Sequence, residues 1–137
     1  MGLVARVLAA IVGLLDVETG SWALIDPRGW FASYPGFGHH WVAGEGSYNE
    51  HLVTDAGAGF LAIGIVLVFA AVSGRALALR LAAAGLLAHA LPHFLFHVTN
   101  PHRGLHGFDV AAGVWGLLLE SVVAIAILVT VRTERVR

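Results

Sequence analysis

The chain has 137 residues, of which 58% are hydrophobic and only 12% are charged, and its formal net charge is −1. Soluble domains carry about 25% charged residues, so this chain, with a mean hydropathy of +0.79, lies far outside that class. It has no lysine, which argues against the basic patch of a nucleic-acid-binding protein, and no cysteine, which excludes disulfides, iron–sulfur clusters and thiolate zinc sites. Any metal ion would be held by nitrogen and oxygen atoms.

Long apolar runs predict four membrane-spanning helices, at about residues 3–25, 49–73, 76–98 and 109–131. The first span is expected to end before Pro27, because proline disfavours helix in the preceding residue. Asn49 and Asp109 are expected to cap the second and fourth spans, and Pro92 is expected to bend the third. The N-terminal run lacks a convincing cleavage site and is interpreted as an uncleaved first span. The chain is therefore predicted to be all-α, a single-domain integral membrane four-helix bundle.

The segment between the first two spans, residues 27–49, is rich in glycine and aromatic residues. Aromatic rings with a polar edge settle in the headgroup region of a membrane. This segment is therefore expected to be a surface loop that covers the bundle as a lid. Small residues inside the spans are expected to let helices pack closely, and they are Gly57, Gly59, Gly64, Gly85, Gly113 and Gly116.

The arginines set the expected orientation in the membrane. Two of them, Arg28 and Arg103, fall on one side of the predicted bundle. Six fall on the other side: Arg6, Arg75, Arg80, Arg132, Arg135 and Arg137. By the positive-inside rule, both termini are expected in the cytoplasm, so the protein is predicted to be a multi-pass protein of a bacterial plasma membrane.

Three histidines, His89, His93 and His97, recur at every fourth residue of the third span. On a helix this spacing forms one stripe, and an imidazole in an apolar helix needs a partner to offset its desolvation. Histidines four residues apart can also ligate one metal ion from a single helix. The alternative is that each histidine hydrogen-bonds a neighbouring helix and only ties the bundle together.

Four further candidate ligands lie in the same outer half of the predicted bundle: His51, Asp55, Asp16 and Glu18. The carboxylate of Asp55, four residues after His51, either orients that imidazole or binds the same ion. Asp16 and Glu18 point to nearly opposite sides of their helix, so one is expected to face the bundle and the other lipid or a partner. Glu120, near the midplane, has the same two interpretations. Weaker candidates in the loops are His39, His40, His102 and His106.

These residues predict a membrane metalloprotein with a histidine–carboxylate site, and nitrogen and oxygen ligands admit copper, zinc or non-haem iron. Copper or iron would permit redox chemistry on a lipophilic substrate or quinone, but the sequence does not decide whether the protein is an enzyme. A transporter is disfavoured, because the inner half offers no ionisable relay residues.

Two alternatives stay open at this point. The first is an accessory or stabilising subunit of a larger membrane enzyme complex, with partner subunits or a second copy of the chain beside it in the lipid bilayer. The second is b-type haem binding by two histidines from different helices. That ligand pair would have to include His51 or a loop histidine, since the other histidines within the spans share one helix.

Three short motifs carry a resemblance to known proteins: WALIDP at residues 22–27, YNEHLVTDAG at residues 48–57 and PHFLFH at residues 92–97. Together they resemble small four-span membrane proteins of actinobacteria, which are distantly similar to DoxX-like bundles. The resemblance implies a four-helix fold in a bacterial plasma membrane. It implies no activity and no mechanism.

Overall fold

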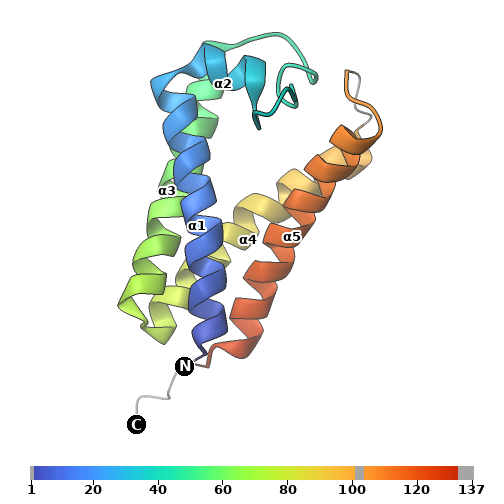
Figure 1. The fold of residues 1–137 in the computed structure, drawn as a ribbon. Coiled ribbons are helices and arrows are strands. Elements are labelled where there is room, and N and C mark those ends of the chain that lie inside the picture. Colours follow the sequence, from blue (N-terminus) through green and yellow to red (C-terminus); the bar gives the residue numbers. More distant parts are fainter. Residues whose placement is uncertain (1, 101–103, 133–137) are drawn as a thin grey trace.

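The structure is a computed structural model that describes residues 2–100 and 104–132. This described part is all-helical, as the sequence predicts (Figure 1). Its helices are α1 (Leu3–Ile25), α2 (Pro27–Ser33), α3 (Glu50–Ser73), α4 (Ala76–Thr99) and α5 (Phe108–Thr130). The four long helices agree with the predicted spans to within one residue at each end, because local signals set their boundaries. One such signal is the predicted cap of α3, where the Asn49 side chain accepts a hydrogen bond from the Leu52 N–H.

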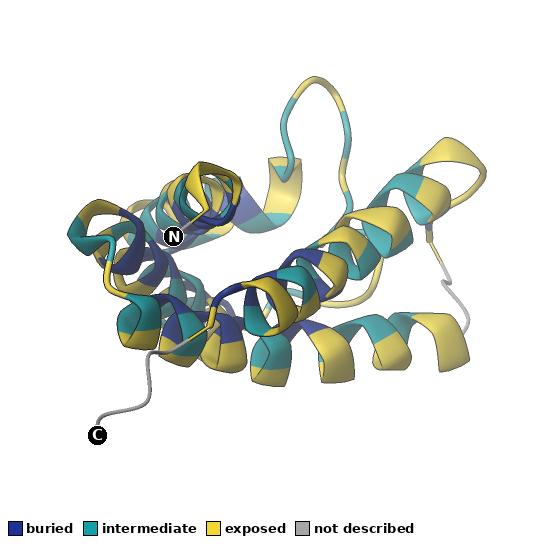
Figure 2. Ribbon diagram, turned by 90° about the horizontal axis from the view of Figure 1, so that it is seen from below, coloured by how far each residue is buried: buried dark blue, intermediate teal, exposed yellow. Residues whose placement is uncertain are grey.

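Three of the helices, α3, α4 and α5, are long and apolar enough to cross a membrane. Large apolar side chains lie exposed along them, and Figure 2 shows buried residues where the helices meet and exposed residues on the outward faces. Such surfaces suit contact with lipid tails, so the three helices indicate a membrane-embedded protein. The first helix, α1, carries Arg6, Asp16 and Glu18 and is not among the three.

The closest helix contact joins α1 to α3 through glycine. A Cβ atom added at Gly64 would lie 2.6 Å from the Val17 backbone nitrogen, and one added at Gly13 would lie 2.9 Å from the Leu67 Cβ atom. Gly20 and Gly57 form a second such contact nearer the other end of the pair. Close backbone approach of this kind needs residues without a side chain.

The prediction that six glycines smooth helix contacts is only partly correct. Gly57 and Gly64 do lie at the α1–α3 contact, but a Cβ atom at Gly59, Gly85 or Gly116 would meet no atom within 4 Å. A Cβ atom at Gly113 would meet only the Trp41 ring, at 3.9 Å. The difference arises because Gly57 and Gly64 lie on the face that α3 turns to α1, whereas Gly85 and Gly116 are exposed.

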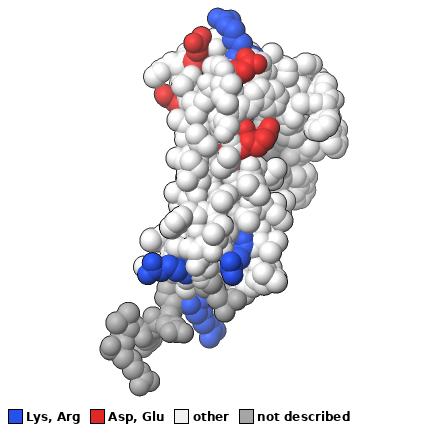
Figure 3. Space-filling view, turned by 60° about the vertical axis from the view of Figure 1, so that its left-hand side comes forward, with Lys and Arg blue, Asp and Glu red and all other residues white. Residues whose placement is uncertain are grey.

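One end of the bundle carries arginine. We call it the arginine end; in the described part it holds Arg6, Arg75, Arg80 and Arg132. The Arg6 Nε atom donates to the Ala71 carbonyl at 2.8 Å, and Arg80 donates to the Val131 carbonyl at 2.8 Å. These contacts satisfy carbonyls at helix C-termini that have no partner within their own helix. In Figure 3 the basic side chains gather toward this end and the acidic ones toward the other, where one basic group also lies.

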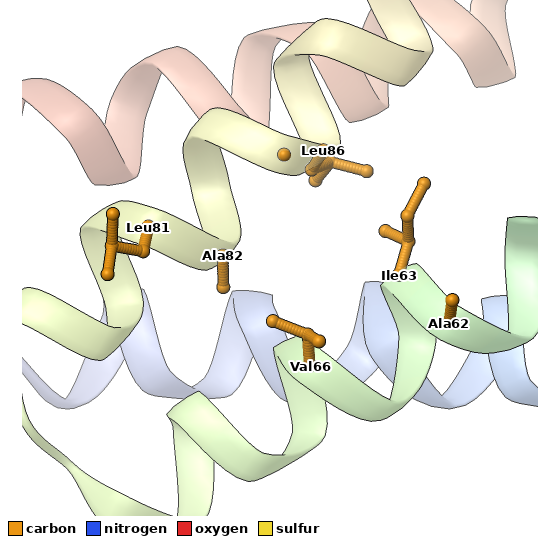
Figure 4. A pocket seen from close by; sticks show the side chains of 7 residues that line it. Ala62, Ile63, Val66, Leu81, Ala82 and Leu86 are labelled. Carbon is orange, nitrogen blue, oxygen red and sulfur yellow. The ribbon is translucent and has the colours of Figure 1, made fainter.

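The half of the bundle next to the arginine end has a packed apolar core. Its fully buried large side chains are Leu67, Leu79, Leu86 and Ile127. A shallow apolar hollow of about 200 Å³ lies beside this core, between α3 and α4 (Figure 4). None of the seven candidate metal ligands lines it.

The opposite end is covered by α2 and the segment that follows it. The predicted loop begins with this short helix, whose start is capped by the Asp26 side chain accepting from the Gly29 N–H at 2.9 Å. Residues 34–49, which we call the strap, then cross to the start of α5. There the Trp41 ring nitrogen donates to the Asp109 carboxylate at 2.9 Å, and His39 Nδ1 lies 2.6 Å from the same oxygen. The strap therefore covers the bundle as the expected lid does.

The predicted role of Asp109 as the cap of the fourth long helix is wrong. The cap residue of α5 is Gly107, and no side chain bonds to the first turn from that position. Asp109 lies one residue inside the helix, and its carboxylate holds the strap instead. Seen from the side in Figure 1, the α4–α5 pair leans away from the α1–α3 pair toward this strap end.

Candidate functional site

The predicted histidine stripe on α4 is present and half-buried. The ring centroids of His89 and His93 lie 5.8 Å apart, and those of His93 and His97 lie 4.9 Å apart. The Nε2 atoms of His93 and His97 face each other at 3.1 Å. Each of the two rings is therefore turned so that its Nε2 atom points toward the other ring.

This arrangement suits two kinds of chemistry. In a hydrogen bond, one Nε2 carries the proton and donates it to the lone pair of the other. In a metal site, both lone pairs point at one ion. With metal–nitrogen distances of about 2.0–2.1 Å, two nitrogens at tetrahedral or right angles stand about 2.9–3.4 Å apart. The observed separation of 3.1 Å falls inside that range.

His89 continues the stripe toward the middle of the bundle and has a different environment. Its ring meets the edge of Phe60 of α3, with centroids 5.1 Å apart. Its Nε2 atom is buried and has no hydrogen-bond partner. A buried polar nitrogen without a partner is costly, so His89 has unused bonding capacity beside the His93–His97 pair.

His51 and Asp55 pair with each other at the strap end of α3. The His51 Nε2 atom lies 3.4 Å from the Asp55 carboxylate, and the two side chains are 82% and 63% exposed. Ala62 lines the hollow between α3 and α4. Asp55 lies seven residues, or two helical turns, before Ala62, so both residues lie on the same side of α3. The pairing agrees with the expectation that the carboxylate orients the imidazole, but the pair lies on the outside of the bundle.

The two acids of α1 point to opposite sides, as expected. Asp16 is buried, with 4% of its surface exposed, whereas Glu18 is exposed. Across the bundle, Glu120 lies on the face of α5 that carries the core residues Ala124 and Ile127. The Asp16 Oδ2 and Glu120 Oε2 atoms are buried and have no hydrogen-bond partner.

The structure does not assemble the seven candidate ligands into one centre. Within residues 2–100 and 104–132, no three histidine, aspartate or glutamate side chains lie together closely enough to hold a metal ion. The His93–His97 pair is formed, whereas Glu18, His51 and Asp55 lie exposed. The larger ligand set stays a prediction.

The loop histidines serve local contacts where they are described. His39 contacts Asp109, and His40 Nδ1 donates to the Ala32 carbonyl at 2.6 Å. His106 is exposed, and His102 lies outside the described residues. The strap histidines therefore hold the strap in place.

Tyr34, the first residue of the strap, is predicted from the sequence only as one of the aromatic residues of a surface loop. Its ring packs against Trp30 and Trp41, with centroids 5.2 and 6.1 Å away. Burial raises the pKa of its hydroxyl; a side-chain hydrogen bond with Thr19 lowers that pKa, and nearby carboxyl groups of α1 and α5 raise it further. The aromatic loop marked this region, but no periodicity in it indicated which ring turns inward.

Comparisons with known protein families, with curated proteins and with solved structures find no match to this chain. The resemblance to four-span actinobacterial proteins therefore stays a prediction, and the chemistry of the site rests on its own residues.

Proposed function

We propose that this protein is a four-span integral membrane protein, with α1 as the fourth span, that binds one transition-metal ion through His93 and His97. The single observation that carries the proposal is the 3.1 Å separation of their Nε2 atoms. Two neutral imidazoles already turned toward one point need little rearrangement to chelate an ion there. His89 is the next histidine of the stripe, and its buried Nε2 atom has no hydrogen-bond partner. That atom is available as a further metal ligand or as a group that orients one.

A site with two protein nitrogens leaves coordination positions open for water or an outside ligand. Metal sites that do chemistry keep such open positions, whereas structural sites fill them. Nitrogen ligands without sulfur suit copper, zinc or non-haem iron. Copper or iron at this place would supply redox chemistry toward a lipophilic molecule that reaches the site from the bilayer.

The membrane placement that accompanies the proposal follows the arginines. The arginine end faces the cytoplasm of a bacterial cell, both termini lie on that side, and the strap end faces outward. His97 lies near the strap end of α4, two residues before its last residue Thr99. The metal site would therefore load from the outer side of the membrane.

The test is metal content of the protein purified gently in detergent and then titrated with Zn²⁺, Cu²⁺ and Co²⁺. We expect close to one ion per chain, and at least about a hundredfold weaker affinity in His93→Ala and in His97→Ala, since each removes a direct ligand. The matched control is His51→Ala, which removes an equally spaced histidine from the exposed pair on α3. Cobalt absorption bands would report nitrogen coordination directly.

Absence of bound metal in well-folded protein, or equal affinity in all three variants, would contradict the proposal. The His93–His97 contact would then be a hydrogen bond that ties one turn of α4 to the next.

The accessory-subunit alternative is favoured by one observation. His51 and Asp55 form a polar pair on the outside of the bundle, where a partner helix could contact it. Co-purification with a membrane enzyme in fixed stoichiometry, lost in His51→Ala, would support that role. The haem alternative has no comparable support, because the only facing histidine nitrogens belong to one helix among the residues described and cannot lie on opposite sides of a porphyrin.

A further inference from the structure

A second polar feature lies apart from the histidine pair and joins α1 to α5. At about 1.5 Å per residue, Asp16 and Glu120 both lie about 14–18 Å below the strap end of their helices. Each carboxyl group has a buried oxygen without a hydrogen-bond partner, and the two groups are close enough to interact through their charges. Neither lies in the packed apolar core, whose large members belong to the arginine half.

The described part of the chain supplies no positive group to these carboxyls. Two of its acidic groups pair with histidine, in His39–Asp109 and His51–Asp55. The arginines at the arginine end lie beyond the core, and Arg28, exposed at the strap end, lies over the Tyr48 ring at 4.7 Å. A buried carboxylate without a partner is strongly disfavoured. A buried pair of carboxyls that has no positive partner in the chain either holds protons or binds a cation from outside the chain.

One face of α5 runs from the strap to this pair. Asp109, Gly113, Gly116 and Glu120 are spaced at intervals of four, three and four residues, which places them on one side of the helix. At its start, Asp109 is held by Trp41, and the Trp41 ring lies beside Gly113. Gly116 is exposed and a Cβ atom there would meet no atom within 4 Å, so open space borders this face of α5 one turn before Glu120.

Aromatic rings and a hydroxyl line the same region. Tyr34 follows α2, and its hydroxyl lies within electrostatic reach of Glu120, Glu18 and Asp16. Its ring packs against Trp22 as well as Trp41. Faces of tyrosine and tryptophan attract cations. Carboxylates below and aromatic rings above together form the recognition surface for a cation that carries an apolar group.

We propose that Asp16 and Glu120 bind an organic ammonium group, which enters past Trp41 with its apolar body toward Tyr34 and Trp41. A primary ammonium has three N–H donors and can bond both carboxylates at once. This site goes beyond the proposed metal function and uses none of its ligands.

The packing of the arginine half makes this a binding site and not a passage. Beyond Asp16 and Glu120, the bundle interior is filled by alanine and larger apolar side chains, including the fully buried Leu79 and Ile127. Passage of a cation through such a core would need polar groups to replace its water. The site is therefore closed toward the arginine end.

The experiment measures binding of 2-phenylethylamine to the protein in phosphatidylcholine nanodiscs, by calorimetry and by the change in tryptophan fluorescence. We expect saturable binding at one site per chain. Glu120→Gln and Asp16→Asn, which keep side-chain shape and remove the charge, should each weaken it at least about tenfold. Their control is Glu50→Gln, at an exposed acid at the start of α3, and this variant should bind as the unmodified protein does.

A second pair of variants tests this face of α5 without changing charge. Gly116→Leu fills the open space one turn before Glu120 and should abolish binding. Gly85→Leu, also at a position where a Cβ atom meets nothing within 4 Å, fills space beside the α3–α4 hollow and should have no effect. Helix content and elution volume establish that each variant is folded.

The source of the ammonium group is distinguished by lipid. If phosphatidylethanolamine co-purifies with the protein and is lost in Glu120→Gln, the ligand is a lipid headgroup; if 2-phenylethylamine binds and no such lipid is retained, it is a free amine. Either result supports the site. Folded protein that binds neither, or binding that is unchanged in Glu120→Gln, would overturn it. Metal affinity of Glu120→Gln should remain normal, so failure here is separate from failure of the metal proposal.

Discussion

The two halves of the bundle are built on opposite principles. The arginine half packs fully buried leucine and isoleucine, and its arginines close the helix C-termini by bonding free carbonyls. Among the described residues, the buried polar atoms without a partner lie on Asp16, Trp30, His89 and Glu120, in the strap half or at its border with the arginine half. Residues that serve only stability satisfy their own bonding capacity, and unsatisfied buried groups indicate a place for something else to bind. The arginine half therefore supports the fold, and the strap half carries the candidate chemistry.

The largest loss of stability is expected from a substitution that separates α1 from α3. Gly64→Leu would place side-chain atoms against the Val17 backbone, which cannot move aside without moving the whole helix. We expect a loss of about 3 kcal/mol in the free energy of unfolding. Unfolding in increasing dodecyl sulfate, followed by circular dichroism, measures it.

The control for Gly64→Leu is the same substitution at Gly85, where a Cβ atom meets no neighbour within 4 Å. We expect a change there below about 0.5 kcal/mol. Equal losses at both positions would show that the α1–α3 contact does not hold the bundle together.

The apolar core is tested by shortening one fully buried side chain. Leu79→Ala leaves a cavity in the arginine half and should cost about 2 kcal/mol, at the low end for such changes because lipid offers unfolded helices an apolar surrounding too. Leu95→Ala, on the same helix but 50% exposed in the strap half, should cost less than about 0.5 kcal/mol. The same unfolding assay applies, and a larger loss from Leu95→Ala would reverse the assignment of the two halves.

The strap is expected to open independently of the bundle. Asp109→Ala removes the carboxylate that receives Trp41 and His39, which should weaken closure of the strap by about 1–2 kcal/mol. Hydrogen exchange should then rise in residues 34–49 while α3 and α4 keep their protection. His106→Ala, an exposed histidine near the same helix start, is the control and should leave exchange unchanged. Loss of protection throughout the bundle would show that the strap is part of the core.

The smallest effect is expected at the exposed pair on α3. His51→Ala should change the free energy of unfolding by less than about 0.5 kcal/mol, because solvent and headgroups screen an exposed ion pair. Its metal affinity should equal that of the unmodified protein. A loss of affinity as large as that of His93→Ala would instead bring α3 and α4 together in the metal-bound protein and restore the larger ligand set.

Local patterns in the sequence determined the helices and the side of each helix on which a residue lies. Apolar runs with Asn49 before one helix and Pro27 after another gave boundaries correct to one residue, because caps and chain breakers act on their immediate neighbours. Helical spacing likewise determined the histidine stripe and the opposition of Asp16 and Glu18, since both follow from 100° of rotation per residue.

Only the tertiary structure decided which of these faces meet. Spacing does not reveal that Gly64 contacts α1 while Gly116 borders free space, nor that Asp109 holds a strap from a segment far away in the chain. It also does not reveal that Tyr34 turns toward the acids of two helices. These contacts depend on how helices cross and where a loop passes, which side-chain packing over the whole bundle sets and no local pattern encodes.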